Sequence, residues 1–102
     1  MMKATEILSQ RKWRHNLKNR KSVRSFQIPK AVWDTTKVND WTKRLLKIEL
    51  NTGIKLKGAA TITSGREISI PTHLRHYFEE ADWFDCEIVN DTIYETVSLD
   101  IY

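Results

Sequence analysis

The sequence has little cysteine, proline or glycine and contains no long apolar run. Its 102 residues include one cysteine, two prolines and three glycines. A single cysteine, Cys86, excludes an internal disulfide and fits a reducing compartment, so we expect a cytoplasmic protein in which Cys86 is a small buried residue. No stretch reaches the roughly 18 apolar residues of a membrane helix, and residues 1–15 lack the apolar segment of a signal peptide. We therefore expect no membrane partner.

Motifs that indicate catalysis are also missing. There is no Gly-rich phosphate loop, and no arrangement of Ser, His and Asp stands out. His73, His76 and Glu80 have a spacing that would place them on one side of a helix as metal ligands. Neighbouring histidines on a small helix are far more often surface residues. We therefore expect a protein that is not an enzyme and that has no catalytic residue, no metal and no cofactor.

Basic residues, by contrast, are concentrated at one end. Residues 1–57 contain 15 Lys and Arg against 4 Asp and Glu, a net charge of +11. Residues 58–102 contain 2 against 9, a net charge of −7. The basic half would attract a polyanion, and nucleic acid is the commonest one in a cell. The alternative is a surface kept soluble by charge.

Residues 4–18 favour a short helix. Thr5 suits the N-cap position, Glu6 suits the first turn, and the later Arg and Lys residues suit the C-terminal end of the helix dipole. The apolar stripe of this helix is narrow. We therefore expect residues 1–16 to form a helix or an arm that orders only on a partner.

Two stretches share one local pattern, RSFQIPKAVW from Arg24 to Trp33 and GREISIPTHLRHYF from Gly65 to Phe78. In each, apolar residues alternate along a short strand, and a proline then ends the strand and begins a helix. A Ser64-Gly65 turn precedes the second strand, and its glycine can adopt a positive φ. Further alternation predicts two turns, at Asn51-Thr52-Gly53 and at Asn90-Asp91-Thr92, the second followed by a strand through Val97, Leu99 and Ile101.

The two stretches belong to an internal repeat. A shift of 42 residues aligns Arg24 with Arg66, Phe26 with Ile68, Ile28 with Ile70, Pro29 with Pro71, Val32 with Leu74, and Asp40-Trp41 with Asp82-Trp83. A further shift of two then aligns Ile48 with Ile88 and Thr52 with Thr92. Each unit has a few short strands and one small helix, which is too little for a core of its own. We therefore expect one domain, residues 1–102, in which repeats at about 17–57 and about 59–99 face each other as a pseudo-dimer.

The second repeat has a characteristic order: a strand, a Gly-Arg turn, a strand that ends in Ile-Pro, a helix that begins x-x-Leu-Arg, and a hairpin. The residues of this pattern are Thr61, Ile62, Thr63, Gly65, Arg66, Ile68, Ile70, Pro71, Leu74, Arg75, Phe78, Asp85, Ile88 and the Asn90-Asp91-Thr92 turn. The pattern resembles the swapped-hairpin DNA-binding domain of the AbrB, MazE and SpoVT family. The first repeat is a degenerate copy, with Val23 in place of the glycine and Trp33 in place of the arginine that follows leucine.

The resemblance implies an intertwined, mainly β barrel with short helices, formed by two tandem copies in one chain. Most members of this family are transcriptional regulators, or antitoxins that repress their own operons, and their first strand and turn face DNA. The resemblance therefore implies a sequence-specific or shape-selective double-stranded DNA-binding protein. Together with the basic tract before them, the matched positions give these candidate DNA-binding residues: Lys12, Arg14, Lys18, Arg20, Lys21, Arg24, Arg66 and Arg75.

Several alternatives remain open. Arg66 and Arg75 could form ion pairs with Glu67 or Glu79. Trp13 could stack on a base or pack against the barrel; Trp41 and Trp83 are expected in the core, and Trp33 on the surface. RNA or single-stranded DNA could replace duplex DNA, and two chains could form a homodimer. The acidic C-terminal half could instead bind and inhibit a basic protein partner, as an antitoxin or adaptor does.

Overall fold

The strands form one curled sheet, and short helices lie at both ends of it. The computed structural model describes residues 5–17, 23–36, 42–63, 65–89 and 97–102. The elements in this part of the chain are β1 (Thr5–Ile7), β2 (Lys12–Asn16), β3 (Ser25–Gln27), α1 (Lys30–Thr36), β4 (Thr42–Leu50), β5 (Lys55–Ile62), β6 (Glu67–Ser69), a 3-10 helix η1 (Thr72–Leu74), α2 (Arg75–Glu79), β7 (Trp83–Val89) and β8 (Asp100–Ile101). The strand order is β1-β2-β7-β4-β5-β6-β3, and β8 pairs with β5. The predicted mainly β, barrel-like fold class is confirmed.

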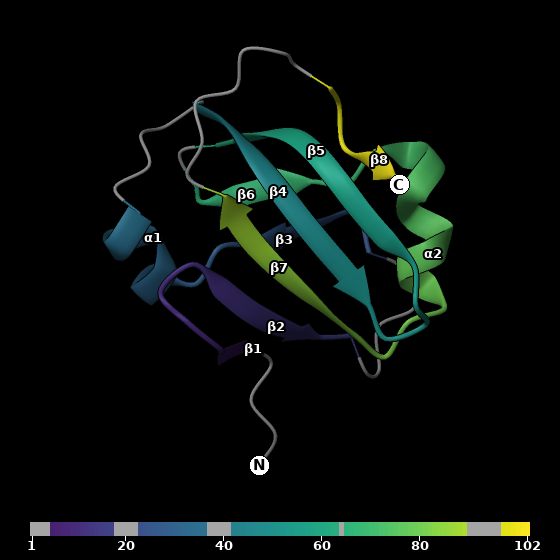
Figure 1. Cartoon of the computed structure of the whole chain (residues 1–102), viewed down its shortest axis with the longest axis horizontal. Coiled ribbons are helices and arrows are strands. Elements are labelled where there is room, and N and C mark those ends of the chain that lie inside the picture. The colour runs from purple at the N-terminus through teal and green to yellow at the C-terminus, as the bar shows by residue number, and fades with distance from the viewer. Residues whose placement is uncertain (1–4, 18–22, 37–41, 64, 90–96) are drawn as a thin grey trace.

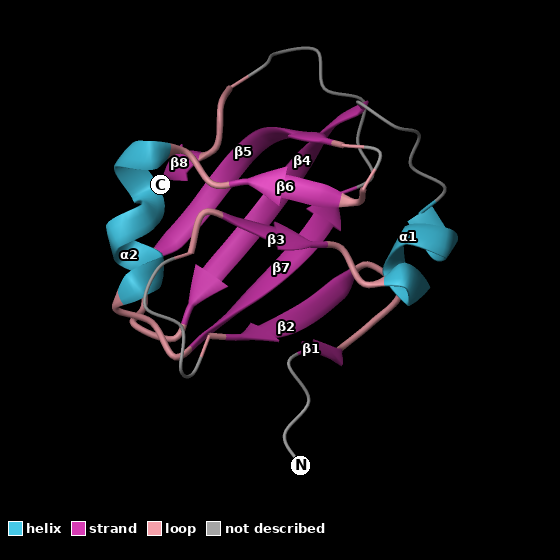
Figure 2. Ribbon diagram, turned by 180° about the vertical axis from the view of Figure 1, so that it is seen from behind, coloured by secondary structure: helices cyan, strands magenta, loops and turns pink. Residues whose placement is uncertain are grey.

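The sheet curls into a half-barrel around one core. In Figure 1, β4 and β7 lie in front of β3 and β6, and Figure 2 shows the same layers from behind. Helices α1 and α2 lie at opposite ends of the half-barrel (Figures 1 and 2). The ring of Phe26 on β3 lies 6.4 Å from the ring of Trp13 on β2 and 5.0 Å from the ring of Phe84 on β7. The two layers therefore share their apolar side chains. Neither described helix has the length and apolar character needed to cross a membrane.

The helix or arm predicted at the N-terminus is wrong. β1 and β2 form an antiparallel hairpin, with Thr5 opposite His15 and Ile7 opposite Trp13, and β7 pairs with the other edge of β2. Trp13 is fully buried and His15 is 8% exposed, while Lys12 and Arg14 face outward. This two-residue alternation is the pattern of a half-buried strand. Burial of the large indole outweighs the helix preference of the charged residues around it.

The two Ile-Pro stretches lie side by side as an antiparallel pair. Phe26 of β3 lies opposite Ile68 of β6, which is the aligned position 42 residues later. Two matching backbone hydrogen bonds of 2.8 Å flank this pair: Ile28 N to Arg66 O and Ile70 N to Arg24 O. Matching bonds also follow the two prolines: Val32 N to Pro29 O at 3.0 Å and Leu74 N to Pro71 O at 2.9 Å. Aligned positions of the two stretches therefore make equivalent contacts.

The turn predicted at Asn51-Thr52-Gly53 is confirmed. Gly53 has a φ of 98°, and its N–H donates to the Leu50 carbonyl at 2.9 Å. β4 and β5 pair on either side of this turn, from Glu49 opposite Lys55 to Thr42 opposite Ile62. β5 is continuous, so the boundary that we expected between the repeats, near residues 57–59, falls inside one strand.

The C-terminal strand pairs with an unexpected neighbour. The turn predicted at Asn90-Asp91-Thr92 lies outside the described residues, but the strand after it pairs with β5 and not with β7. Both edges of β7 are already occupied, by β2 and β4. Leu99 is 2% exposed, whereas Val97 and Ile101 are 64% and 43% exposed. Among the described tail residues 97–102, Leu99 is the one whose side chain enters the core.

Candidate nucleic-acid interface

Two of the predicted DNA-binding arginines flank opposite ends of one antiparallel strand pair, which we call the β3–β6 ribbon (residues 24–28 and 66–70). Arg24 precedes β3 and Arg66 precedes β6, and the strands are antiparallel. The two positions are four residues apart along the ribbon, which corresponds to about 13 Å at 3.3 Å per residue. Phe26 and Ile68 are buried beneath it. The outward face is consequently polar, and it lies on the near side in Figure 2.

Neither of these arginines has a side-chain partner among the residues that the structure describes. Arg24 is exposed and Arg66 is half-buried. Neither side chain forms a hydrogen bond or ion pair with another residue in the described ranges. The ion pairs considered with Glu67 and Glu79 are likewise not formed between described residues. As far as the described part of the chain shows, both groups can bind an anion.

Arg66 holds its position through a strained turn. Its φ is 59°, and this left-handed conformation costs a non-glycine residue about 1 kcal/mol or more. The turn is closed by Arg66 N, which donates to Thr63 O at 3.0 Å, and by Glu67 N, which donates to Thr63 Oγ1 at 3.2 Å. We expected the positive φ at Gly65, and the structure places it one residue later. Backbone strain of this kind is common at functional positions.

Four polar side chains lie between the two arginines. Gln27 is opposite Glu67, and Ser25 is opposite Ser69. Gln27 Nε2 donates to the Gly65 carbonyl at 3.1 Å, which holds the amide across the ribbon and leaves its oxygen and second N–H for another partner. A shallow cavity of about 180 Å³ adjoins the ribbon and is lined by His15, Ser25, Phe26, Gln27 and Glu67.

Arg75 lies at the Arg24 end of the ribbon. Its Nε donates to the Ile70 carbonyl at 3.0 Å, and the Ile70 N–H donates to Arg24 O. The contact fixes the junction between β6 and the helical segment that follows. One end of the ribbon thus carries arginines from both halves of the chain. Three further predicted DNA contacts, Lys18, Arg20 and Lys21, lie outside the described residues.

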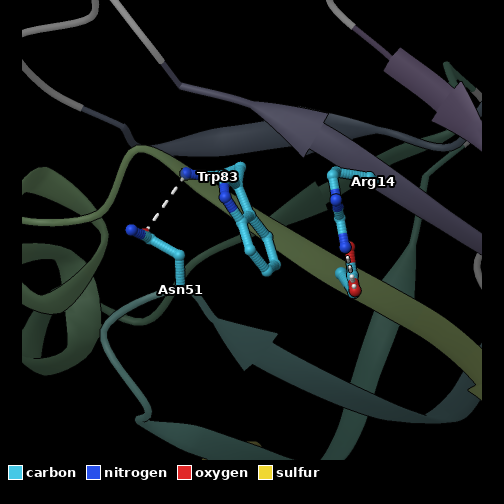
Figure 3. Close-up of polar contacts among 4 residues, drawn as sticks. Arg14, Asn51 and Trp83 are labelled. Carbon is cyan, nitrogen blue, oxygen red and sulfur yellow. Dashed lines mark hydrogen bonds and ion pairs between the residues drawn. The ribbon is translucent and has the colours of Figure 1, made fainter.

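Arg14 is engaged on a different face. Its Nε donates to Asp85 Oδ1 at 2.8 Å and its Nη2 to Asp85 Oδ2 at 3.2 Å. Its Cζ lies 3.8 Å from the centroid of the Trp83 ring. Figure 3 labels both side chains. The hydrogen bond to Asp85 and the nearby charges of Asp85 and Glu6 raise the pKa of Arg14 above its ordinary value. A phosphate would have to compete with Asp85 for this guanidinium.

The Trp83 backbone is fixed from the β4–β5 turn. Asn51 Oδ1 accepts a hydrogen bond from Asp82 N at 2.7 Å. It also accepts one from Trp83 N at 3.4 Å, which Figure 3 marks with a dashed line. The Trp83 side chain is half-buried beneath Arg14, so its predicted place in the core is wrong. Trp33, expected on the surface, packs against the core. Trp13 is buried and cannot stack on a base, and Trp41 lies outside the described residues.

The basic and acidic halves of the sequence alternate across the outer face of the sheet. β7, from the acidic half, lies between β2 and β4 from the basic half. Lys12, another predicted DNA contact, lies opposite Glu87, and Glu87 lies opposite Lys47 on its other side. Charges of both signs therefore neighbour one another on this face, and the asymmetry of the sequence does not become a uniformly basic surface here.

The remaining titratable groups do not form a metal site in the part of the chain that the structure describes, where no cluster of three His, Cys, Asp or Glu side chains is present. His73 Nε2 lies 3.4 Å from Asp100 Oδ1, and the His76 ring lies 3.9 Å from the Tyr77 ring. Cys86 is fully buried, as predicted, and this burial raises the pKa of its thiol well above the ordinary value. Comparison with models of protein families, with curated proteins and with solved structures found no match to this chain.

Proposed function

We propose that the protein binds double-stranded DNA through the β3–β6 ribbon and regulates transcription. The observation that carries the proposal is the placement of Arg24 and Arg66 at the two ends of the β3–β6 ribbon, whose outward face is polar. Their guanidinium groups are not bound by other described side chains. Arginine can grip a phosphate with two donors at once, which makes it the preferred residue for such contacts.

The size of the ribbon suits the major groove. That groove is about 12 Å wide and admits a two-stranded β-ribbon. Arg24 and Arg66 are about 13 Å apart along the strands, so they would contact the backbone on the two sides of the groove. Contacts of this kind fix the register and orientation of the protein without reading sequence.

The two ends of the ribbon differ in their positive charge. The Arg24 end adjoins Arg75 and follows a tract that contains Lys18, Arg20 and Lys21. The Arg66 end carries the acidic neighbour Glu67. We therefore expect the Arg24 end to contribute most of the affinity, and a palindromic site is not required.

The centre of the ribbon supplies groups that can read bases. Glutamine pairs with the N6 and N7 edge of adenine, and glutamate accepts from the N4 amino group of cytosine. Gln27 and Glu67 face each other at this place in the register. They are the residues we propose for direct readout, while the arginines supply position and affinity.

Fluorescence anisotropy with duplex DNA at several salt concentrations tests the proposal. Arg24→Ala should weaken binding about tenfold on every duplex and reduce the slope of log K against log salt by about 1. Lys57→Ala removes the same charge from an exposed side chain on β5, outside the ribbon, and should leave both quantities near wild type. Gln27→Ala should lower discrimination between duplexes more than average affinity.

If Arg24→Ala and Lys57→Ala weaken duplex binding equally, the loss reflects only the change in net charge. That result would contradict a specific interface at the ribbon. Preference for a single-stranded or RNA competitor would contradict duplex recognition. Absence of duplex binding near physiological salt, with a protein recovered in a pull-down, would favour the antitoxin or adaptor function. The acidic half supports that function less, because Asp85 is already paired with Arg14.

A further inference from the structure

The pairing of β4 with β7 repeats the relation seen in the β3–β6 ribbon. Lys47 lies opposite Glu87, 40 positions later, and the flanking pairs are Leu46 with Ile88 and Ile48 with Cys86. Each pair of strands is therefore centred on two positions that align in the internal repeat. The two centres lie in opposite layers of the half-barrel (Figures 1 and 2). A local two-fold axis through both layers would generate this register.

We propose that residues 1–52 and 53–102 are two units related by this axis, and that their charges make each unit select the other rather than a copy of itself. The first unit contains β2, β3, α1 and β4, and the second contains β5, β6, α2 and β7. The first has 13 Lys and Arg against 4 Asp and Glu, a net charge of +9, and the second has 4 against 9, a net charge of −5. This selection does not depend on DNA binding.

One row of side chains across the outer face carries the selection. It runs through Lys12 of β2, Glu87 of β7, Lys47 of β4 and Lys57 of β5, each opposite the next in register. Because Lys47 and Glu87 are equivalent about the axis, their outer neighbours Lys12 and Lys57 are equivalent as well. The signs run plus, minus, plus, plus, which gives two unlike neighbours and one like pair.

A pair of first units would change this row. A copy of the first unit would place Lys47 where Glu87 stands, so the row would consist of four lysines in succession. Like charges directly opposite each other in a sheet are destabilising. A pair of second units would place two Glu87 side chains opposite each other on the axis. The row therefore opposes self-pairing of the first unit, and the net charge of −5 opposes self-pairing of the second.

The ion pair between Arg14 and Asp85 also favours pairing of the two different units. It joins the two units, with Nε and Oδ1 2.8 Å apart. The position equivalent to Asp85 in the first unit is Leu45, 40 residues earlier, so a copy of the first unit would offer Arg14 no carboxylate. Glu49 lies opposite Asp85 and is a like-charge neighbour, but Lys55 lies opposite Glu49 on its other side.

A cycle of charge reversals in the full chain tests the row. Glu87→Lys leaves only like charges, and we expect the midpoint of thermal unfolding to fall by about 5 °C at low salt and by less in 1 M salt. Lys47→Glu changes the order of charges to plus, minus, minus, plus, which again has two unlike neighbours and one like pair. Its midpoint of thermal unfolding should therefore stay near that of the wild type. The double variant Lys47→Glu/Glu87→Lys gives plus, plus, minus, plus and should recover the loss, which a packing role for Glu87 would not permit. A double variant as unstable as Glu87→Lys would overturn the proposal.

Selection between units is tested with a chain that carries a protease site in the turn at residues 51–53 and is cut after folding. When the cut protein is unfolded and refolded at low salt, native mass spectrometry should show only complexes with one copy of each piece. The same protein with Glu87→Lys should reassemble poorly at low salt and better at high salt. Complexes of two identical pieces in the wild-type mixture would overturn the proposal. Equal reassembly of the wild type and the Glu87→Lys variant at low salt would also overturn it, even if the charge reversals changed thermal stability.

Discussion

Replacing Gly58 with alanine should detach the C-terminal tail from β5. Gly58 has a φ of 151°, and a Cβ on it would lie 2.5 Å from Leu99 Cα, Leu99 N and Ser98 O. Atoms cannot approach so closely, and the obstacle is backbone, so no rotation of a side chain relieves the clash. The tail has to move, and Leu99 then leaves the core.

The cost follows from what the tail contributes. Burial of the Leu99 side chain is worth about 2–3 kcal/mol, and the hydrogen bonds from Ala59 N to Val97 O and from Leu99 N to Ala59 O add about 1 kcal/mol each. Part of this loss is offset because the released tail gains conformational entropy. We expect Gly58→Ala to lower the free energy of unfolding by about 2–4 kcal/mol.

Gly53→Ala is the matched control. Gly53 also has a positive φ, of 98°, but a Cβ there would meet no atom within 4 Å. Only the backbone penalty remains, and we expect a loss of about 1 kcal/mol. Urea unfolding of both variants, in the full chain and in a chain that ends at residue 96, measures the difference. The difference between the two losses of unfolding free energy should vanish in the chain without the tail. If Gly58→Ala and Gly53→Ala destabilise the full chain equally, the reasoning is refuted.

Three further outcomes follow from the described contacts. Trp13→Ala should lower the free energy of unfolding, measured with urea, by about 3–5 kcal/mol. Ile7→Ala, at a side chain that is 46% exposed, should lower it by less than about 1 kcal/mol. Similar losses for the two variants would contradict the place of β2 in the core. Cys86 should not react with a thiol reagent at pH 8 until the chain unfolds, because burial raises its pKa and blocks access; fast labelling of the native protein would contradict its position. Arg14→Ala should reduce duplex affinity less than Arg24→Ala in the anisotropy assay, because Asp85 already neutralises Arg14, and an equal loss would place β2 in the interface.

Local chemistry predicted the parts of the fold where proline, glycine and apolar alternation agree. Pro29 and Pro71 end β3 and β6 where expected, and Gly53 closes the β4–β5 turn. The alignment of Phe26 with Ile68 anticipated that these residues occupy comparable places, and they are opposite each other in the sheet. The resemblance to the AbrB, MazE and SpoVT family stays a prediction.

The rest depended on contacts that a local pattern does not contain. Trp13 and His15 alternate with outward-facing residues, a strand signal that the helix-favouring charges around them obscured. The partner of Asp85 is Arg14, 71 residues away, so neither residue reveals the ion pair by its neighbours in sequence. The candidate site shows the same limit, because Arg24 and Arg75 both hydrogen-bond to Ile70 at one end of the ribbon, and this arrangement depends on the pairing of β3 with β6.

An NMR titration of the labelled protein with duplex DNA tests the ribbon as the binding surface most directly. Amide signals of residues 24–28 and 66–70 should shift, while those of Lys47, Glu49 and Glu87 on the opposite layer should stay in place. Shifts confined to the β4–β7 layer, or no shifts at a salt concentration where the duplex is bound, would contradict it.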